Sequence, residues 1–91
     1  MHLLIVYDIS DNKRRYCVEK LLSSYGKRVN YSVFEVEIAV AKHHKLITLL
    51  KENSSKKEDN IRIYILGKES LKKSFVLHSN ERVFKNEPLY V

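Results

Sequence analysis

The strongest structural signal in the chain is the segment Leu3-Leu4-Ile5-Val6-Tyr7-Asp8. Its first five residues are apolar and include β-branched and aromatic side chains, and a polar stretch over 8–12 follows at once. An unbroken apolar run of this length, bounded by polar residues, predicts a strand in the centre of a sheet. Asp8 is then expected at the carboxyl end of that strand, where the sheet meets solvent.

Helical and strand periods alternate downstream of this segment. Apolar residues at helical spacing predict an amphipathic helix over 13–25, capped by one of residues 10–12, with Gly26 at its C′ position. Between Arg28 and Ala41 the period changes to two, which predicts two short strands joined by a turn or bulge around 33–35. A second helix is expected over 42–53 and a strand over 61–66. In the last quarter of the chain, short strands are expected at 75–77 and 88–91.

This order of elements, β-α-β-β-α-β with one or two extra strands, predicts an α+β fold of the ferredoxin-like type with an antiparallel sheet. At 91 residues the chain is too short to divide into two cores, so residues 1–91 are predicted to form a single domain. A domain of this size buries only part of its apolar surface alone, which favours oligomerisation. Because this topology hosts many functions, function has to be inferred from a site.

The charge balance indicates a polyanionic partner. Seventeen Lys and Arg against eleven Asp and Glu give a net charge of +6, with an isoelectric point near 9.5, as is common in nucleic-acid-binding proteins. The single cysteine, Cys17, cannot form an internal disulfide, which fits a reducing compartment. The longest apolar run is too short to cross a membrane. We therefore expect a soluble cytoplasmic protein with no membrane partner.

Asp8 is the first candidate functional residue. Mg²⁺ keeps several waters and needs only one or two protein carboxylates together with phosphate oxygens. One Asp8 from each subunit of a two-fold dimer would meet that need. The same carboxylate can instead serve only to cap the loop before the first helix, because Asp is common at such turns. Both interpretations stay open.

Three cations, Lys13, Arg14 and Arg15, fall in the first turn of the predicted first helix. They oppose the helix dipole, and a broken local rule invites a functional explanation. A helix N-terminus attracts phosphate, so these side chains are predicted to hold a phosphodiester beside Asp8. Arg28 belongs to the positive charge spread along the rest of the chain, which is typical of sequence-independent binding to a nucleic-acid backbone. A solvated basic turn is the alternative interpretation.

Other chemistries find no support in the sequence. His43 and His44 are adjacent, so on a helix they diverge by about 100° and cannot share one metal ion. The chain has no second cysteine for a zinc site, no Walker or GxGxxG loop, and no nucleophile elbow around Ser32. Aromatic residues, Tyr31 among them, can offer stacking faces to bases, but alternation places several of them in the core.

Several short motifs occur in order along residues 2 to about 66. They are Val6-Tyr7-Asp8-Ile9, Asn12-Lys13-Arg14-Arg15, Leu21-Leu22, Tyr25-Gly26, Arg28-Val29, Tyr31-Ser32-Val33-Phe34-Glu35 and the strand over 61–66. None is diagnostic alone, but their ordered combination resembles the CRISPR-associated protein 2 family. The remainder of the chain matches weakly.

This resemblance implies a ferredoxin-like homodimer in which residues 75–91 form an extension that binds the partner. It implies a role in CRISPR adaptation, as a bridge between dimers of the CRISPR-associated protein 1 integrase that holds the duplex DNA destined to become a spacer. It also implies a Mg²⁺-dependent endonuclease acting on double-stranded DNA or single-stranded RNA. Asp8 matches the family's metal-binding aspartate and is the expected catalytic residue. Tyr7, Arg15 and Phe34 fall on or close to other site positions, and we assign supporting roles to Tyr7, Ser32 and Phe34.

Three functions follow from these observations. The first is a metal-dependent endonuclease centred on Asp8, with Arg14 and Arg15 holding the phosphodiester. The second is an electropositive scaffold for duplex DNA and the integrase, with Asp8 serving structure. The third is a small toxin-type ribonuclease without an integrase partner. The adaptation role is favoured over a nuclease role, and one protein can have both.

Overall fold

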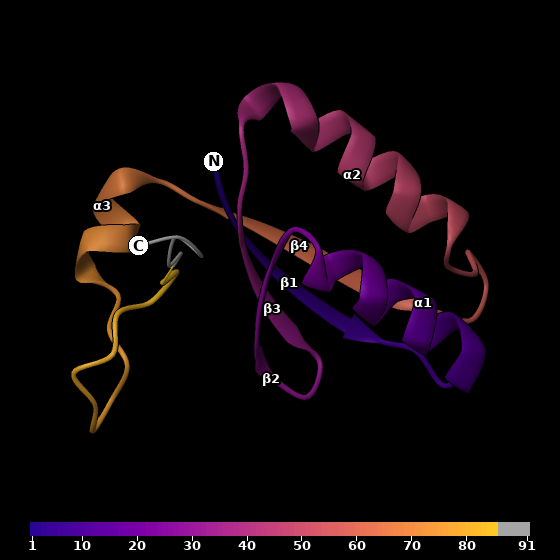
Figure 1. Ribbon diagram of the computed structural model, residues 1–91, viewed down its shortest axis with the longest axis horizontal. Helices are drawn as coiled ribbons and strands as arrows, with labels where there is room; N and C mark the ends of the chain where they lie inside the picture. Colours follow the sequence, from indigo (N-terminus) through magenta and orange to yellow (C-terminus); the bar gives the residue numbers. More distant parts are fainter. Residues whose placement is uncertain (86–91) are drawn as a thin grey trace.

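Two helices cover one face of a four-stranded antiparallel sheet in the computed structural model, which describes residues 1–85 (Figure 1). The elements are β1 (His2–Asp8), α1 (Asn12–Ser23), β2 (Gly26–Asn30), β3 (Val33–Glu37), α2 (Val40–Glu52), β4 (Asn60–Leu66) and α3 (Lys68–Lys73). The strand order is β2-β3-β1-β4, and all neighbouring strands are antiparallel. The predicted ferredoxin-like α+β architecture is confirmed.

The core lies between the sheet and the two long helices. Its fully buried members are Leu3 and Ile5 of β1, Val18 and Leu22 of α1, Phe34 and Val36 of β3, and Leu46 of α2. Strand β1 lies between β3 and β4, as its apolar run predicts. Because successive side chains of a strand point to opposite faces, only every second residue of β1 reaches this core.

The other face of the sheet carries no helix from α1 or α2, and we call it the open face. Leu4 and Val6 lie on it, half-buried, with Tyr64 opposite Leu4 and Val33 opposite Val6 on the neighbouring strands. Tyr64 is 48% exposed. The apolar run of β1 therefore places apolar side chains on both faces of the sheet, and the chain by itself buries those of one face completely.

Helix α1 begins as predicted but ends earlier. Asp11 caps it, since its carboxylate accepts a hydrogen bond of 2.9 Å from the Arg14 amide. The expectation that Gly26 is the C′ residue is wrong, because the helix ends at Ser23 with Ser24 as its cap and Gly26 is the first residue of β2. A Cβ atom at Gly26 would lie 2.2 Å from the Glu35 carbonyl oxygen. Glycine is needed for close approach of two strands, not for a helix end.

The turn between β2 and β3 lies at residues 31–32, not at 33–35 as predicted. The Asn30 side chain accepts a 2.8 Å hydrogen bond from the Tyr31 amide and so helps to form the turn. The strand register shifts between Arg28 and Asn30, and this bulge changes the alternation before the turn. Residues 33–37 are then one regular strand in which Phe34 and Val36 face the core.

The end of the described chain differs most from the prediction. Helix α3 was not foreseen, because six residues with one apolar side chain give no helical periodicity. The predicted strand over 75–77 is wrong, since these residues form no strand, and the predicted strand over 88–91 lies outside the described residues. Phe75 and Leu77 are 74% and 69% exposed, so no other part of residues 1–85 covers them.

Residues 74–85 lie to one side of the sheet, together with α3 (Figure 1). The Phe84 amide donates a 2.8 Å hydrogen bond to the Glu35 carboxylate of β3. The Phe84 ring meets His2 edge-on, with ring centroids 5.2 Å apart. This segment therefore covers part of the open face near the start of β1.

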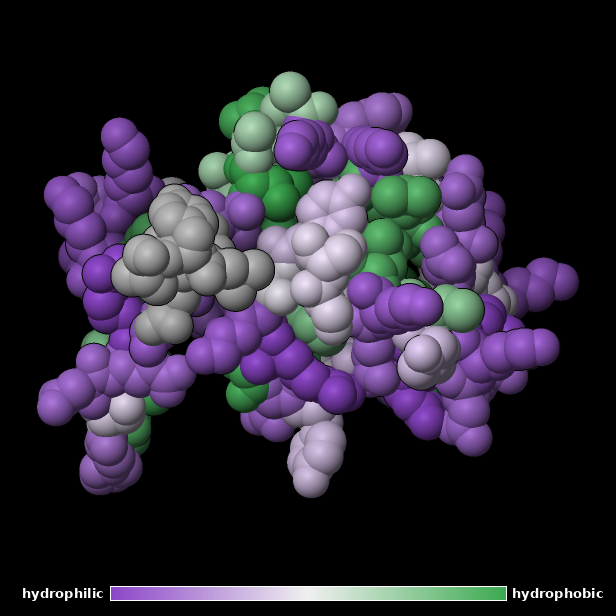
Figure 2. All heavy atoms as spheres, viewed as in Figure 1, coloured by the Kyte–Doolittle hydropathy of each residue, from purple (hydrophilic) through white to green (hydrophobic). Residues whose placement is uncertain are grey.

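Hydrophilic side chains dominate the surface seen in Figure 2, and apolar ones gather mainly near α2. Among the described residues, none of the helices has both the length and the apolar character needed to cross a bilayer.

Candidate active site and nucleic-acid interface

Asp8 is the last residue of β1, and its side chain is exposed. It pairs in register with Asn60, the first residue of β4. Ser32 lies at the same end of the sheet, because its carbonyl accepts a 3.1 Å hydrogen bond from the Tyr7 amide. Within residues 1–85, no hydrogen bond or ion pair engages the Asp8 carboxylate. The predicted catalytic residue is thus available to a ligand.

The Tyr7 side chain lies on the face of the sheet opposite to that of Asp8, in a polar cluster under α1. Its hydroxyl lies 2.7 Å from a Glu19 carboxylate oxygen and 3.0 Å from the Tyr31 carbonyl oxygen. Arg28 donates to the same two acceptors, at 2.6 Å and 2.7 Å. Burial, followed by the hydrogen bond to Glu19, raises the pKa of Tyr7 to about 12. The neutral phenol therefore joins β1, α1 and the β2–β3 turn, which supports its assignment as a supporting residue.

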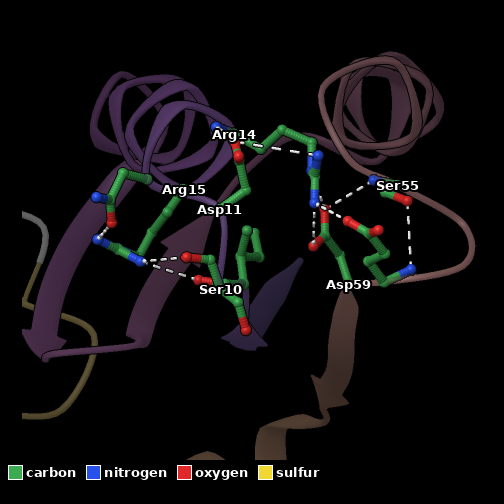
Figure 3. A network of polar contacts seen from close by, with 9 residues as sticks. Ser10, Asp11, Arg14, Arg15, Ser55 and Asp59 are labelled. Atoms are coloured by element: carbon green, nitrogen blue, oxygen red, sulfur yellow. Dashed lines mark hydrogen bonds and ion pairs between the residues drawn. The ribbon is translucent and has the colours of Figure 1, made fainter.

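Arg15 binds the loop that follows Asp8. Its guanidinium donates hydrogen bonds to the carbonyl oxygens of Ile9 at 3.0 Å and Ser10 at 3.4 Å. It also donates to the side-chain oxygen of Asn12. Figure 3 shows this side chain reaching from α1 back to the loop. Arg15 therefore sets the path of the chain as it leaves Asp8.

Arg14 crosses from α1 to the loop between α2 and β4 (Figure 3). Its Nε donates to Asp59 at 2.8 Å, and its Nη2 donates to Glu58 at 2.8 Å. The Asp59 side chain is only 1% exposed and also accepts a 2.7 Å hydrogen bond from the Ser55 amide. The hydrogen bond from Arg14 lowers the pKa of Asp59, and the two carboxylates raise the pKa of Arg14. The guanidinium that the sequence assigned to a phosphodiester is engaged within the chain.

The other predicted residues take distinct places. Lys13 is exposed, and no other residue within 1–85 pairs with it. Phe34 is 1% exposed, with its ring 6.2 Å from the Tyr7 ring between centroids. It supports Tyr7 by packing and reaches no surface. The structure thus brings Asp8, Ser32, Arg15 and the Tyr7 cluster to one end of the sheet, while Arg14 acts beside it.

The donor set at this end fits half of a Mg²⁺ site. In the described part of the chain, no group of three or more His, Cys, Asp or Glu side chains is placed to hold a metal ion. One exposed carboxylate per subunit still suits Mg²⁺, which takes few protein ligands and keeps its waters. Asp8 is the unengaged carboxylate that residues 1–85 offer at this end of the sheet, and a second one from another copy would complete such a site.

Sequence reasoning missed Glu19 and Asp59, and it named Tyr31 only as one of several aromatic residues that can offer stacking faces to bases. Glu19 and Asp59 become significant only through an arginine on another element, Arg28 for Glu19 and Arg14 for Asp59. Asp59 follows Ser55 by four residues, a spacing that suits a hydrogen bond from a backbone amide to a side chain. This spacing was the one signal in the sequence that could have identified Asp59.

Comparisons with known proteins agree on one family. The family model described as CRISPR associated protein Cas2 matches residues 1–74. The CRISPR-associated endoribonuclease Cas2 3 of Synechocystis sp. is 40% identical over 68 residues, 75% of this chain and 74% of that protein. A protein of the same name from Chloroflexus aurantiacus is 37% identical over 76 residues, 84% of this chain and 82% of that one.

Solved structures give the same result. Streptococcus pyogenes Cas2 at pH 6.5 superimposes with a TM-score of 0.75 at 34% identity, covering 85% of this chain and 99% of that one. A chain of a partial Cas6-RT-Cas1–Cas2 complex superimposes with a TM-score of 0.59 at 33% identity, covering 84% and 89%. The likeness thus extends over the sheet and both long helices.

Proposed function

Because this chain belongs to the CRISPR associated protein Cas2 family, we propose that it acts in CRISPR adaptation as a homodimer that binds duplex DNA and bridges the Cas1 integrase. We further propose that it has Mg²⁺-dependent endonuclease activity, on RNA or double-stranded DNA, centred on Asp8. The observation that carries the catalytic part is the exposed, unengaged carboxylate of Asp8 at the end of a central strand. Family membership sets aside the unrelated toxin-type ribonuclease.

The open face supports the homodimer. Leu4, Val6, Val33 and Tyr64 meet there across three strands, and Val29 of the edge strand is 45% exposed. Residues 74–85 cover only the part near His2 and Glu35. A second copy stacked on this face would bury apolar surface and bring two Asp8 carboxylates into one assembly. Residues 75–91 are proposed to contribute to that interface.

The charge distribution supports nucleic-acid binding without base readout. Six exposed lysines at the start of α1, on α2 and in the following loop form no ion pair within residues 1–85; they are Lys13, Lys42, Lys45, Lys51, Lys56 and Lys57. Such side chains neutralise phosphates and release counterions, which gives salt-dependent affinity. Of the predicted cations, Lys13 is exposed without a partner in residues 1–85 and is proposed to contact the phosphodiester, whereas Arg15 and Arg28 are bonded to acceptors of the chain itself. Arg14 is proposed to serve structure instead.

At the proposed catalytic centre the chain's own residues hold the site in place. Asp8 from each subunit would hold Mg²⁺, and Arg15 and the Tyr7 cluster fix the backbone on either side of Asp8. When bound, Mg²⁺ supplies charge neutralisation at the scissile phosphodiester. The integrase contact rests on family membership and on the solved Cas1–Cas2 complex to which this chain is similar.

The test measures cleavage and binding of labelled duplex DNA and single-stranded RNA, with Mg²⁺ or with EDTA. The variant is Asp8→Asn, and the matched control is Glu52→Gln, which removes the same charge from an exposed position on α2. We expect cleavage by wild type and control only, and none in EDTA. Salt-dependent duplex binding with no Asp8-dependent cleavage would leave the scaffold role alone. That second function is favoured by the exposed lysines of α1, α2 and the following loop, which bind phosphates without a metal ion.

A further inference from the structure

Tyr31 is the most exposed large aromatic residue at the Asp8 end of the sheet. It lies in the turn between β2 and β3, and 86% of it is accessible to solvent. Figure 1 shows this turn at the end of the β2–β3 hairpin. An aromatic ring that stays largely hydrated on folding contributes little to the core, so the fold itself does not require it there.

The backbone beneath this ring is held unusually well for a turn. The Tyr31 carbonyl oxygen lies 3.0 Å from the Tyr7 hydroxyl and accepts from Arg28 Nη2 at 2.7 Å and Nε at 3.1 Å. Its amide donates to the Asn30 side chain at 2.8 Å. An exposed ring on a fixed backbone loses little entropy when it makes a contact, which is the property of a preorganised binding residue.

The surroundings of the ring match a nucleotide better than a protein partner. The Arg28 guanidinium, paired with Glu19 but still 47% exposed, lies directly against the Tyr31 backbone. The next residue, Ser32, is bonded to the strand that ends at Asp8. Stacking on an aromatic face beside cations is how proteins hold unpaired bases without reading their sequence. The chain's net charge of +6 favours the same class of ligand.

We propose that the Tyr31 ring stacks on an unpaired nucleobase of the nucleic acid bound at this end of the sheet. The proposal rests on the proposed nucleic-acid binding and adds to it a preference for unpaired over paired strands. Phosphate contacts by lysine treat paired and unpaired strands alike, whereas Tyr31 strengthens binding only where a base is free to stack. The base on Tyr31 positions the adjoining backbone toward Asp8.

The test uses a single-stranded RNA carrying 2-aminopurine, whose fluorescence falls on stacking, and a dumbbell DNA duplex with no free ends. Both are titrated with the intact protein as wild type, Tyr31→Phe, Tyr31→Ala and the control Tyr16→Ala, which alters a tyrosine on α1 that is 64% exposed. We expect quenching with wild type, Tyr31→Phe and Tyr16→Ala. Tyr31→Ala should lose quenching and bind the single strand about 5- to 100-fold more weakly, with dumbbell affinity and salt dependence unchanged.

Three outcomes overturn the proposal. If Tyr31→Ala binds and quenches like wild type while binding stays salt-dependent, stacking is refuted and the proposed function stands. If wild type binds neither probe, the proposed function fails together with stacking. If Tyr31→Ala leaves nucleic-acid binding intact but changes the mass of the particle in light scattering, the ring serves a protein contact. Thermal unfolding of each variant verifies the fold, which Tyr31→Ala should retain because only backbone atoms of Tyr31 are bonded.

Discussion

Replacing Tyr7 by Phe removes one hydroxyl from the cluster that joins β1, α1 and the β2–β3 turn. A hydrogen bond to a charged acceptor contributes about 1.5–3 kcal/mol to stability. Arg28 still bonds Glu19 at 2.6 Å and the Tyr31 carbonyl at 2.7 Å in the variant, so neither acceptor is left unpaired. We therefore expect the lower end of that range, about 1.5 kcal/mol, which lowers Tm by roughly 6–12 °C in a domain of this size.

The assay is urea unfolding followed by circular dichroism at pH 7 and one fixed protein concentration. Tyr16→Phe is the matched control, because it removes a hydroxyl from an exposed ring of α1 and should change stability by less than about 0.5 kcal/mol. If Tyr7→Phe is no less stable than this control, Arg28 alone holds the cluster and the argument is refuted. The ring of the variant still packs beside Phe34, so a loss larger than about 3 kcal/mol would contradict it as well.

The dependence of stability on alkaline pH gives a second test of the Tyr7 hydroxyl. Its pKa is raised to about 12 in the folded chain, against about 10 in the unfolded chain. The neutral phenol therefore contributes its full stability below pH 10, and that contribution is lost as pH rises through 10 to 12. Wild type should lose more unfolding free energy than Tyr7→Phe over this window. Parallel curves for the two proteins would show that Tyr7 titrates normally.

Three further predictions concern the scaffold of the site. Gly26→Ala should destabilise by about 1–3 kcal/mol, because the new methyl group would lie 2.2 Å from the Glu35 carbonyl oxygen; Gly67→Ala, with nothing within 4 Å, is the control in thermal unfolding. Arg14 lowers the pKa of Asp59, so the pair stabilises the fold above about pH 4 and this stabilisation is lost as the pH falls further. Arg14→Gln should therefore lose less unfolding free energy than wild type below about pH 4. Parallel curves of urea unfolding free energy against pH for the two proteins would refute this. Leu22→Ala, at a fully buried position, should cost about 2–5 kcal/mol by the same assay, and a loss below 1 kcal/mol would contradict the assigned core.

Local patterns were sufficient for the main elements. The apolar run ending at Asp8 predicted a central strand, and the helical spacing around Val18 and Leu22 predicted α1, because burial of one face imposes a period that the residues themselves display. The ordered motifs over residues 2–66 predicted the family, which the comparisons confirm. The turn at 31–32 was displaced in the prediction because a bulge changes the alternation without any glycine or proline to mark it.

The prediction for the last quarter of the chain was wrong where it can be compared. Residues 75–77 have the composition of a strand, but a strand needs a neighbour to satisfy its backbone, and none of the strands within residues 1–85 pairs with them. The exposed Phe75 and Leu77 side chains fit a segment whose partner is another molecule. Composition alone cannot distinguish a strand paired within the chain from one that awaits a second copy.

The roles of the charged residues depended on contacts between distant parts of the chain. The sequence showed three adjacent cations after Asp8 and predicted phosphate binding for all of them. In the folded protein Arg14 binds Asp59, 45 positions away, Arg15 binds backbone carbonyls, and Lys13 remains exposed. Periodicity reports which face of an element is buried, because burial acts on each residue separately. The ion pair between Arg14 and Asp59 forms only because the fold brings its two ends within hydrogen-bonding distance, so no single stretch of sequence contains it.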